Sequence, residues 1–337
     1  MPILEQHEVA AYLLARGLVG RRSIAAGTLR IADATSRNRN FRVTGTGGDS
    51  YLLKQGIAAD SAESLANEAA LYRRLAAAGG PLAAAIPRLH RFDAARSLLV
   101  LEWIADGEDL YRHHAERRRC SLPLARALGR VLAALHAIAP DDEELRRDAP
   151  WVLSLHRPRL DALRYLTAPS IELIAAIQRD ERFARALDAL REDWRVEALV
   201  HRDVKWANCI VLRPATIKLV DWEMAGWGDP ALDVGAALGE LLGWRLRAGA
   251  AAPGGERPAM GALWRAYAGV RRLDAQPADE LLVRALRYAG ARLVQSAYEK
   301  TQETGRASER VARGLELGRD LLVAPRAAAR ELLRGAA

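Results

Sequence analysis

Cysteine and lysine are both scarce in this chain of 337 residues. Only two cysteines are present, Cys120 and Cys209, which is too few for a disulfide framework or a cysteine zinc site and fits a reducing compartment. Lysine is scarce as well, because nearly all of the 50 basic residues are arginines. Arginine does not replace the compact charge of a lysine, so the positions that keep lysine are candidates for a specific use. The four lysines are Lys54, Lys205, Lys218 and Lys300.

Long apolar segments are also missing. Half of the residues are hydrophobic, but no stretch approaches the roughly 18 apolar residues of a membrane-spanning helix. The first residues include Glu5 and Glu8 and lack a basic region or a clear cleavage site, which argues against a signal peptide. We therefore expect a cytoplasmic protein without a membrane partner, long enough for two lobes.

The charge of the chain is moderately basic. The net charge is +8, from 50 basic and 42 acidic residues. The acidic residues are interspersed, and no long basic run alternates with aromatic residues, so we expect no nucleic-acid partner. A basic cleft also favours an anionic substrate such as ATP.

The segment HRDVKWAN, residues 201–208, is the most informative feature of the chain. It matches the pattern H-R-D-x-x-x-x-N at every fixed position. Thirteen residues after Asn208, the apolar run IKLVD ends on Asp221. Phosphoryl transfer needs a carboxylate that accepts the proton of the attacking hydroxyl, and metal ions that neutralise the phosphate oxygens. Asp203 can supply the first, and Asn208 and Asp221 offer the oxygen ligands that suit Mg²⁺.

Together these segments resemble the aminoglycoside phosphotransferase and choline-kinase group of the protein-kinase-like superfamily. DWE stands in place of DFG, and GWGDPALDVGAAL follows without a long activation segment. The resemblance covers roughly residues 29–320 and implies an α+β, bilobal, protein-kinase-like fold. A small lobe, 1–103, with a helical extension over 1–26, would hold an antiparallel sheet and one key helix and bind the nucleotide. A larger, mostly helical lobe, 104–337, would provide catalysis and the acceptor site.

The resemblance also implies roles for single residues. Asp203 would be the catalytic base, and Asn208 and Asp221 would hold Mg²⁺. Lys205 matches a lysine with which protein serine/threonine kinases steady the γ-phosphate, although aminoglycoside kinases usually have another residue there. Asp233 would tie down the catalytic loop. 

Glu223 lies two residues beyond Asp221 and would share its face if the strand continued. It could then contact a metal or an acceptor, or equally form a surface salt bridge.

The N-terminal half predicts the nucleotide-binding parts. Residues 29–55 indicate three short strands, with Lys54 on the third, where a kinase lysine pairs with the α- and β-phosphates. A helix should begin near Ser61 and end at Gly79. Its inward stripe consists of Leu65, Ala69, Tyr72 and Leu75.

Glu68 lies beside this stripe, and a buried carboxylate is costly unless it is paired. We expect it to pair with Lys54, in preference to the competing Glu63, which lies further toward solvent.

Two further segments are expected to contact ATP. The glycine-rich turn at 45–48 is too close to Lys54, so Thr35–Asn40 is the better phosphate loop, with Ser36, Asn38 and Asn40 as candidate ligands; an ordinary surface loop is the alternative. Glu102, Trp103 and Ile104 occupy the position of the kinase hinge, where main-chain groups would bind adenine. The alternative there is a buried strand without ligand contact.

The C-terminal half predicts mainly helices. Residues 122–140 have strong helical periodicity, and 257–335 should also be helical. The charged stretches 141–148 and 179–193 indicate exposed helices in a region where small-molecule kinases carry variable insertions.

Three functional hypotheses follow. The first is an ATP- and Mg²⁺-dependent kinase that phosphorylates a hydroxyl group of a small molecule. The second keeps this chemistry but transfers phosphate to Ser or Thr of a biosynthetic peptide, which Lys205 and the loop at 35–41 make plausible. The third is an inactive nucleotide-binding pseudokinase, which the retained lysine, base and metal ligands argue against. The sequence defines neither the acceptor, nor the oligomeric state, nor a preference for ATP over GTP.

Overall fold

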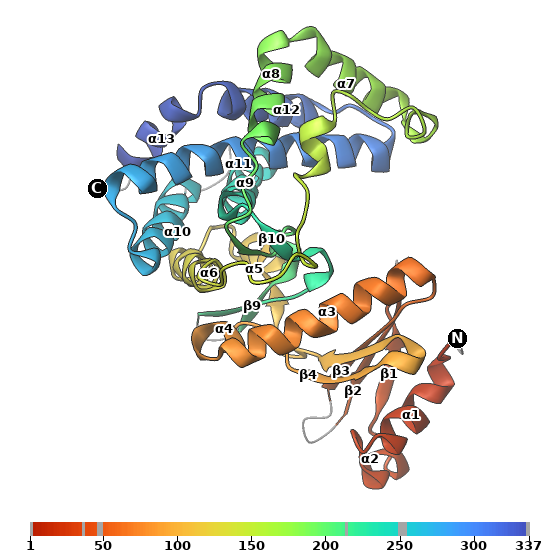
Figure 1. Ribbon diagram of the computed structural model, residues 1–337. Coiled ribbons are helices and arrows are strands. Elements are labelled where there is room, and N and C mark those ends of the chain that lie inside the picture. Colours follow the sequence, from red (N-terminus) through yellow and green to blue (C-terminus); the bar gives the residue numbers. More distant parts are fainter. Residues whose placement is uncertain (1–2, 36–37, 46–49, 213–214, 249–254, 335–337) are drawn as a thin grey trace. The chain divides into compact units, whose positions relative to one another are not determined.

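The computed structural model divides the chain into two compact units (Figure 1). Unit 1 comprises Met1–Glu108 and Ile210–Met224, and unit 2 comprises Asp109–Cys209 and Ala225–Ala337. Unit 1 holds a five-stranded antiparallel sheet and unit 2 is mainly helical, which confirms the predicted α+β class. The structure describes residues 3–35, 38–45, 50–212, 215–248 and 255–334.

Unit 1 is built on a sheet with the strand order β1-β2-β3-β5-β4, in which all neighbours are antiparallel. Its strands are β1 (Arg30–Asp33), β2 (Arg39–Thr44), β3 (Ser50–Gln55), β4 (Leu89–Asp93) and β5 (Leu98–Glu102). Its helices are α1 (Val9–Ala15), α2 (Arg21–Ala25), α3 (Ala59–Ala78) and α4 (Gly80–Ala84), with the 3-10 helices η1 (Gln6–Glu8) and η2 (Ala94–Arg96). The three strands predicted within residues 29–55 are therefore confirmed.

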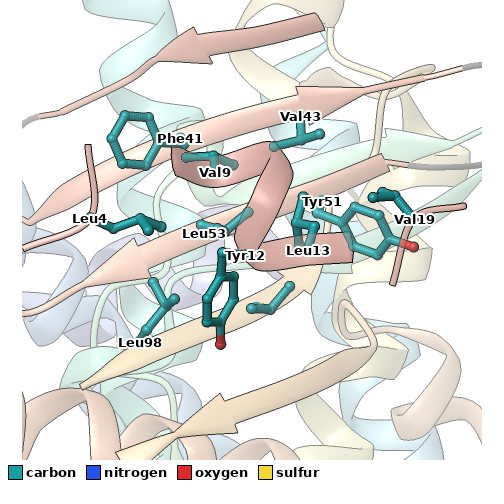
Figure 2. Close-up of a cluster of buried hydrophobic side chains, with 11 residues drawn as sticks. Leu4, Val9, Tyr12, Leu13, Val19, Phe41, Val43, Tyr51, Leu53 and Leu98 are labelled. Carbon is teal, nitrogen blue, oxygen red and sulfur yellow. The ribbon is translucent and has the colours of Figure 1, made fainter. Parts of the chain in front are cut away.

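The two faces of this sheet are covered by different helices. Figure 2 shows α1 packed on one face, where side chains from alternate strand positions, such as Phe41 and Val43 of β2, are fully buried. Tyr51 and Leu53 of β3 belong to the same cluster. Because successive strand residues point to opposite faces, Lys54 points away from α1. That face is covered by α3, which contacts β3, β4 and β5.

The segment 210–224 belongs to unit 1, although the predicted lobe boundary would place it in the second lobe. Backbone pairing explains this placement, because Leu219 N donates to Ala85 O at 2.7 Å. Trp222 is fully buried, and its 3-10 helix η6 (Trp222–Met224) contacts α3. The segment also contains β9 (Thr216–Leu219), which pairs with β8 (Cys209–Leu212).

Unit 2 is organised around the long helix α11, which packs on α9 and α12, while α10 packs on α6. Its helices are α5 (Leu110–Arg117), α6 (Leu122–Leu135), α7 (Ala168–Arg179), α8 (Glu181–Glu192), α9 (Pro230–Ala248), α10 (Glu256–Arg271), α11 (Ala275–Thr304), α12 (Glu309–Val323) and α13 (Pro325–Arg334). Short elements complete it: η3 (Trp151–Ser154), η4 (Leu163–Tyr165), η5 (Trp206–Asn208), β7 (Ala198–Val200) and β10 (Gly226–Gly228), with β6 (Glu108–Asp109) at the unit boundary. Within the described ranges, no helix has both the length and the apolar character to cross a membrane.

Helix α9 lies very close to α11 at one point. A Cβ atom on Gly235 would stand 2.4 Å from Ala285 O and 2.5 Å from the Cβ of Tyr288. No side chain fits at that distance, so glycine is required for this helix contact. The contact fixes the start of α9, where Asp233 lies.

The prediction of a helix over residues 141–148 was wrong. The charged stretch 141–148 forms no helix, because its backbone pairs with β10: Trp227 N donates to Leu145 O at 2.7 Å and Arg147 N donates to Trp227 O at 3.2 Å. Helix α3 begins at Ala59, close to the predicted start near Ser61, and ends at Ala78, just before Gly79, as predicted. Ser61 lies in its first turn, where its hydroxyl accepts a hydrogen bond from Ala58 N at 3.0 Å.

Candidate functional site

In unit 1, Lys54 holds two carboxylates. Its Nζ lies 2.9 Å from Oε2 of Glu68 and 2.9 Å from Oδ1 of Asp221. The side-chain alternation of β3 directs Lys54 toward α3. In α3, Glu68 lies beside the buried apolar stripe, one helical turn before Tyr72. The predicted pair of Lys54 with Glu68 is therefore present, and Glu63 is not its partner.

Burial and charge act in opposite directions on this lysine. Burial lowers the pKa of Lys54, but the charges of Glu68 and Asp221 outweigh it and raise the pKa above its ordinary value. Lys54 is therefore a cation at neutral pH. The side chain of Glu68 is fully buried, whereas that of Asp221 is 37% exposed. Glu68 is thus a fixed partner of the lysine, and Asp221 presents a carboxylate that solvent can reach.

Asp221 does not lie on a strand. Strand β9 ends at Leu219, and Asp221 has a φ of +68° before the 3-10 helix η6 begins. The expectation that Glu223 shares a strand face with Asp221 was therefore wrong. A positive φ is unfavourable for a non-glycine residue. Because of this turn, the carboxylates of Asp221 and Glu223 do not follow the side-chain alternation of a strand.

In unit 2, three polar side chains of the loop after β7 converge. Oδ2 of Asp203 accepts a hydrogen bond from Lys205 Nζ at 2.6 Å and another from Asn208 Nδ2 at 2.9 Å. Asn208 Nδ2 also donates to the main-chain oxygen of Asp203 at 3.0 Å. Among the described residues, no donor reaches Oδ1 of Asp203, so one carboxylate oxygen is left to accept a proton. The same contacts leave Oδ1 of Asn208 as an acceptor for a cation.

Asp233 anchors this loop from beneath. Its fully buried carboxylate accepts hydrogen bonds from the backbone N–H of His201 at 2.6 Å and of Arg202 at 2.8 Å. His136, at the end of α6, lies 3.2 Å from the same carboxylate and 3.0 Å from Tyr267 Oη. The role expected for Asp233 thus has a geometric basis, and His136 supports its carboxylate from the end of α6.

The loop stores backbone strain at its second residue. Arg202 has a φ of +69°, and it is one of five non-glycine residues with positive φ in the described part of the chain. Its guanidinium donates to Asp148 O at 2.9 Å and lies over the ring of Trp194. Such a conformation costs about 1–3 kcal/mol and persists where surrounding contacts impose it, as these do. Arg202 and Asp221 are both among the five, so strain coincides with the candidate site.

The predicted phosphate loop is described only in part. Ser36, and Arg37 beside it, lie outside the described residues. Asn38 is buried, and Asn40 lies in β2 opposite Lys54. Oδ1 of Asn38 and Oδ1 of Asn40 are buried without a hydrogen-bond partner in the described structure. Both amides therefore retain an unused acceptor.

Several polar groups of the predicted hinge already have hydrogen-bond partners inside unit 1. The carboxylate of Glu102 accepts from Lys218 Nζ at 2.6 Å and from Arg88 N at 3.0 Å. Trp103 N donates to Ser50 O at 3.0 Å, so this N–H is already used. Ile104 O accepts from the backbone N–H of Gly107 at 3.2 Å. Any adenine contact here has to use other main-chain groups of the segment.

Sequence analysis missed two charged residues of unit 2. Glu240 lies on α9, and its carboxylate is 3.2 Å from Arg292 of α11. The signal for Glu240 was present, because it is the only charged residue in the stretch VGAALGELLGW. Arg292 had no such signal in an arginine-rich chain.

The chain is similar to known proteins in sequence and in fold. A family model described as the phosphotransferase enzyme family matches residues 28–274. No curated protein matches the chain. An ethanolamine kinase from Plasmodium vivax has a similar structure, with a TM-score of 0.59 and 14% identity over 94% of this chain and 88% of that one.

Two further solved structures are similar. An ADP-bound aminoglycoside phosphotransferase has a TM-score of 0.54 and 17% identity, covering 94% of this chain and 99% of its own. A macrolide 2'-phosphotransferase from Brachybacterium faecium has a TM-score of 0.51 and 20% identity, with coverages of 94% and 99%. At these identities the similarity concerns the fold.

Proposed function

Because this chain belongs to the phosphotransferase enzyme family, whose model matches residues 28–274, we propose that it transfers the γ-phosphoryl group of ATP to a hydroxyl group of a small molecule in a Mg²⁺-dependent reaction. The observation that carries the proposal is the arrangement at Asp203. Its Oδ2 is held by Lys205 and Asn208, and its Oδ1 is left to act as a base. A carboxylate positioned in this way is what a hydroxyl acceptor requires.

The chemistry at Asp203 is an in-line displacement. The acceptor oxygen forms a bond to the γ-phosphorus while the bond from that phosphorus to the β–γ bridging oxygen breaks, and ADP leaves. Asp203 orients the hydroxyl and accepts its proton. The loose transition state requires little covalent help, so the chain contributes mainly by positioning and by charge.

The residues present fit a magnesium ion by their donor chemistry. Asn208 keeps its Oδ1 as an acceptor, and Asp221 presents a partly exposed carboxylate, both of them hard oxygen ligands. When bound, Mg²⁺ neutralises charge on the phosphate oxygens. We assign its ligation to Asn208 and Asp221.

Nucleotide binding is assigned to unit 1. Lys54, oriented by Glu68, would bind the α- and β-phosphates of ATP, and Lys205 of unit 2 would steady the γ-phosphate. Asn38 and Asn40, both in the predicted phosphate loop, retain unused acceptors. The main chain of 102–104 would bind adenine through groups other than the N–H of Trp103.

The first test compares the wild type with Asp203→Asn. Each is incubated with Mg²⁺ and ATP labelled in the γ-phosphate, together with the small-molecule fraction of a host extract. Loss of a general base typically lowers the rate by about 10²- to 10⁴-fold, and we expect a loss in this range. Asp279→Asn, on the exposed side of α11, is the matched control and should keep full activity.

The opposite result would also be informative. If ATP binds to the wild type but neither the small-molecule fraction nor a peptide fraction acquires Asp203-dependent label, the chain is a pseudokinase and the proposal fails.

A peptide acceptor is the second candidate, and one observation favours it. Lys205, whose Nζ lies 2.6 Å from Oδ2 of Asp203, matches a lysine with which protein serine/threonine kinases steady the γ-phosphate. The same labelling experiment with the peptide fraction separates the two candidates. Asp203-dependent label on peptides alone would replace the small-molecule acceptor by a Ser or Thr side chain.

A further inference from the structure

Unit 2 contains a cavity of about 300 Å³ between α5, α9, α11 and α12. One acidic and three basic side chains line it. They are Glu240 and Arg247 of α9, Lys300 of α11 and Arg310 of α12. Tyr111 of α5 adds an aromatic wall. Cavities with a few converging polar groups are where small ligands bind.

Arg247 is held in the wall by aromatic rings. Its guanidinium carbon lies 5.3 Å from the ring centroid of Tyr111 and 5.6 Å from that of Trp206. Its Nε is buried and has no hydrogen-bond partner in the described structure. A buried donor without a partner is costly, so a ligand that supplies an acceptor would be stabilised here.

The charge of the lining is positive. Oε1 of Glu240 is already 3.2 Å from Arg292 Nη2, and its Oε2 is 3.9 Å from Arg247 Nη2. Lys300 is paired with Glu303 at 2.9 Å. Arg310 has no side-chain partner among the described residues. The one acid of the lining is therefore neutralised, and the cavity has an excess of cations.

The electrostatics of Arg247 follow from this crowding. Burial lowers the pKa of Arg247, Glu240 opposes that change, and the charges of Arg310 and Arg292 add to the lowering. An arginine nevertheless stays protonated in proteins, so the cavity keeps its positive charge. A bound anion would relieve the repulsion among these groups, and a bound cation would increase it.

The cavity is linked to the proposed base through two contacts inside unit 2. Trp206, under Arg247, follows Asp203 by three residues in the same loop. Arg292 lines a narrow groove together with Asp203, and the same arginine pairs with Glu240 at the cavity wall. The cavity and the loop of Asp203 are therefore connected through Trp206 and through the pair of Glu240 with Arg292.

We propose that this cavity binds the acceptor and that the acceptor carries a carboxylate or phosphate group in addition to its hydroxyl. The inference rests on the proposed function, since it assigns a class of substrate to the same reaction. Arg247 and Arg310 bind the anionic group, which positions the hydroxyl for transfer of its proton to Asp203 as the γ-phosphoryl group moves to its oxygen. Guanidinium groups are suited to this because they form charge-assisted hydrogen bonds with both kinds of oxyanion. Amine acceptors, which are cations, are disfavoured.

The test is a matched panel of hydroxyl compounds with the full chain, Mg²⁺ and labelled ATP. Glycerate represents carboxylates and glycerol 3-phosphate represents phosphates. Glycerol is the neutral member, and choline and an aminoglycoside are the cationic members. We expect kcat/KM to be highest for one of the two anions, and the comparison between them identifies the preferred group.

Three variants sharpen the result. Arg247→Gln should raise KM for the preferred anion by roughly tenfold to a hundredfold, the usual value of a hydrogen bond to a charged group, and leave KM for ATP unchanged. Arg310→Gln should also raise KM for the preferred anion. Because Arg310 is exposed, this variant is expected to fold even if Arg247→Gln does not. Arg182→Gln, on the exposed face of α8, is the control and should change neither constant.

Failure of this inference can be separated from failure of the proposed function. Asp203-dependent transfer that prefers glycerol or an amine, or that is unaffected by Arg247→Gln and Arg310→Gln, overturns the inference and leaves the proposed function intact. If no compound is labelled, calorimetric titration with glycerate and glycerol 3-phosphate decides. Binding that Arg310→Gln weakens supports the anion site, and absence of binding to the wild type overturns it.

Discussion

In unit 1, two carboxylates that differ in exposure contact one buried cation, Lys54. Lys54 contacts a fully buried carboxylate, Glu68, and a partly exposed one, Asp221. The buried partner fixes the lysine, because an unpaired charge at that depth is strongly unfavourable. The exposed partner, Asp221, is the one that we propose as a metal ligand. Orientation and ligation are thus assigned to different residues.

The first prediction concerns this pair. Lys54→Met leaves the carboxylate of Glu68 buried without its cation, so the free energy of unfolding should fall by about 3–5 kcal/mol, as for other broken buried pairs. The double variant Lys54→Met/Glu68→Gln removes the uncompensated charge and should recover part of that loss. Urea denaturation measures both. Equal stability of the two variants would mean that Glu68 carries no charge in the folded chain.

The second prediction concerns Asp233. Burial acts to raise its pKa, but the contacts with His136 and with the backbone of His201 outweigh burial and hold the pKa below its ordinary value of 3.8. The folded state therefore favours the ionised carboxylate. Its stabilising contribution is fully present above pH 3.8 and is lost as the pH falls toward the lower, folded-state value.

Urea denaturation between pH 3 and pH 6 tests this directly. Asp233→Asn should be less stable than the wild type near pH 6, and the difference should shrink as the solution is acidified. A difference that stays constant across this range would show that the ionisation of Asp233 does not support the loop.

The roles of some of these residues could be predicted from the sequence, and those of others could not. HRDVKWAN identified the loop because each fixed residue has a chemical reason, and Glu68 stood out as an acid beside an apolar stripe. The partner of Glu240 could not be read, because Arg292 is 52 residues away and is one arginine among many. The turn at Asp221 was missed because no glycine marks its positive φ.

At the scale of elements, the packing of α9 on α11 determines where the loop anchor stands. Gly235 allows the approach, and Asp233 lies two residues before it in the same helix. The third prediction is that Gly235→Ala destabilises the chain by about 1–3 kcal/mol through overpacking. Overpacking at this position should also displace Asp233, so kcat should fall as well. Thermal unfolding measures the change in stability, and activity assays measure the change in kcat.

Gly269 in α10 provides the matched control. Apart from the neighbouring backbone of its own helix, no atom of the described residues lies within 4 Å of the position that its Cβ would occupy. Gly269→Ala should therefore stabilise the chain by about 0.5–1 kcal/mol through helix propensity alone. If Gly235→Ala has the same effect as Gly269→Ala, close packing at α9 is not what limits this position.

Local pattern and tertiary pairing competed in one segment. The composition of residues 141–148 favours an exposed helix, and no residue within this stretch indicates another structure. Leu145 and Arg147 nevertheless pair with the backbone of Trp227, some 80 residues later. Strand alternation in β2 and β3 and the helical stripe of α3 were readable because each depends on near neighbours. Backbone pairings between segments far apart in the sequence depend on the whole chain.

At the scale of the whole molecule, nucleotide binding should be visible as stability. A ligand that binds only the folded chain stabilises it by about 2.7 kcal/mol at one hundred times its dissociation constant. The fourth prediction is that a non-hydrolysable ATP analogue with Mg²⁺ raises the melting temperature, and that chelation of the metal removes most of this increase. Asp221→Asn should abolish the dependence on metal, whereas Asp279→Asn should retain it. A metal-independent shift in the wild type would contradict the assignment of Asp221.

Unit 1 is not continuous along the chain, and this has a consequence for synthesis on the ribosome. Residues 1–108 are translated well before 210–224, which supplies Asp221, Trp222 and the backbone partner of Ala85. At about 5–20 residues per second, the first part waits roughly 6–23 s for its completion. During that interval the surface of α3 that Trp222 will cover is exposed in the nascent chain. Chains arrested at residue 209 should therefore be cleaved by protease within 59–78 more readily than chains arrested beyond residue 260.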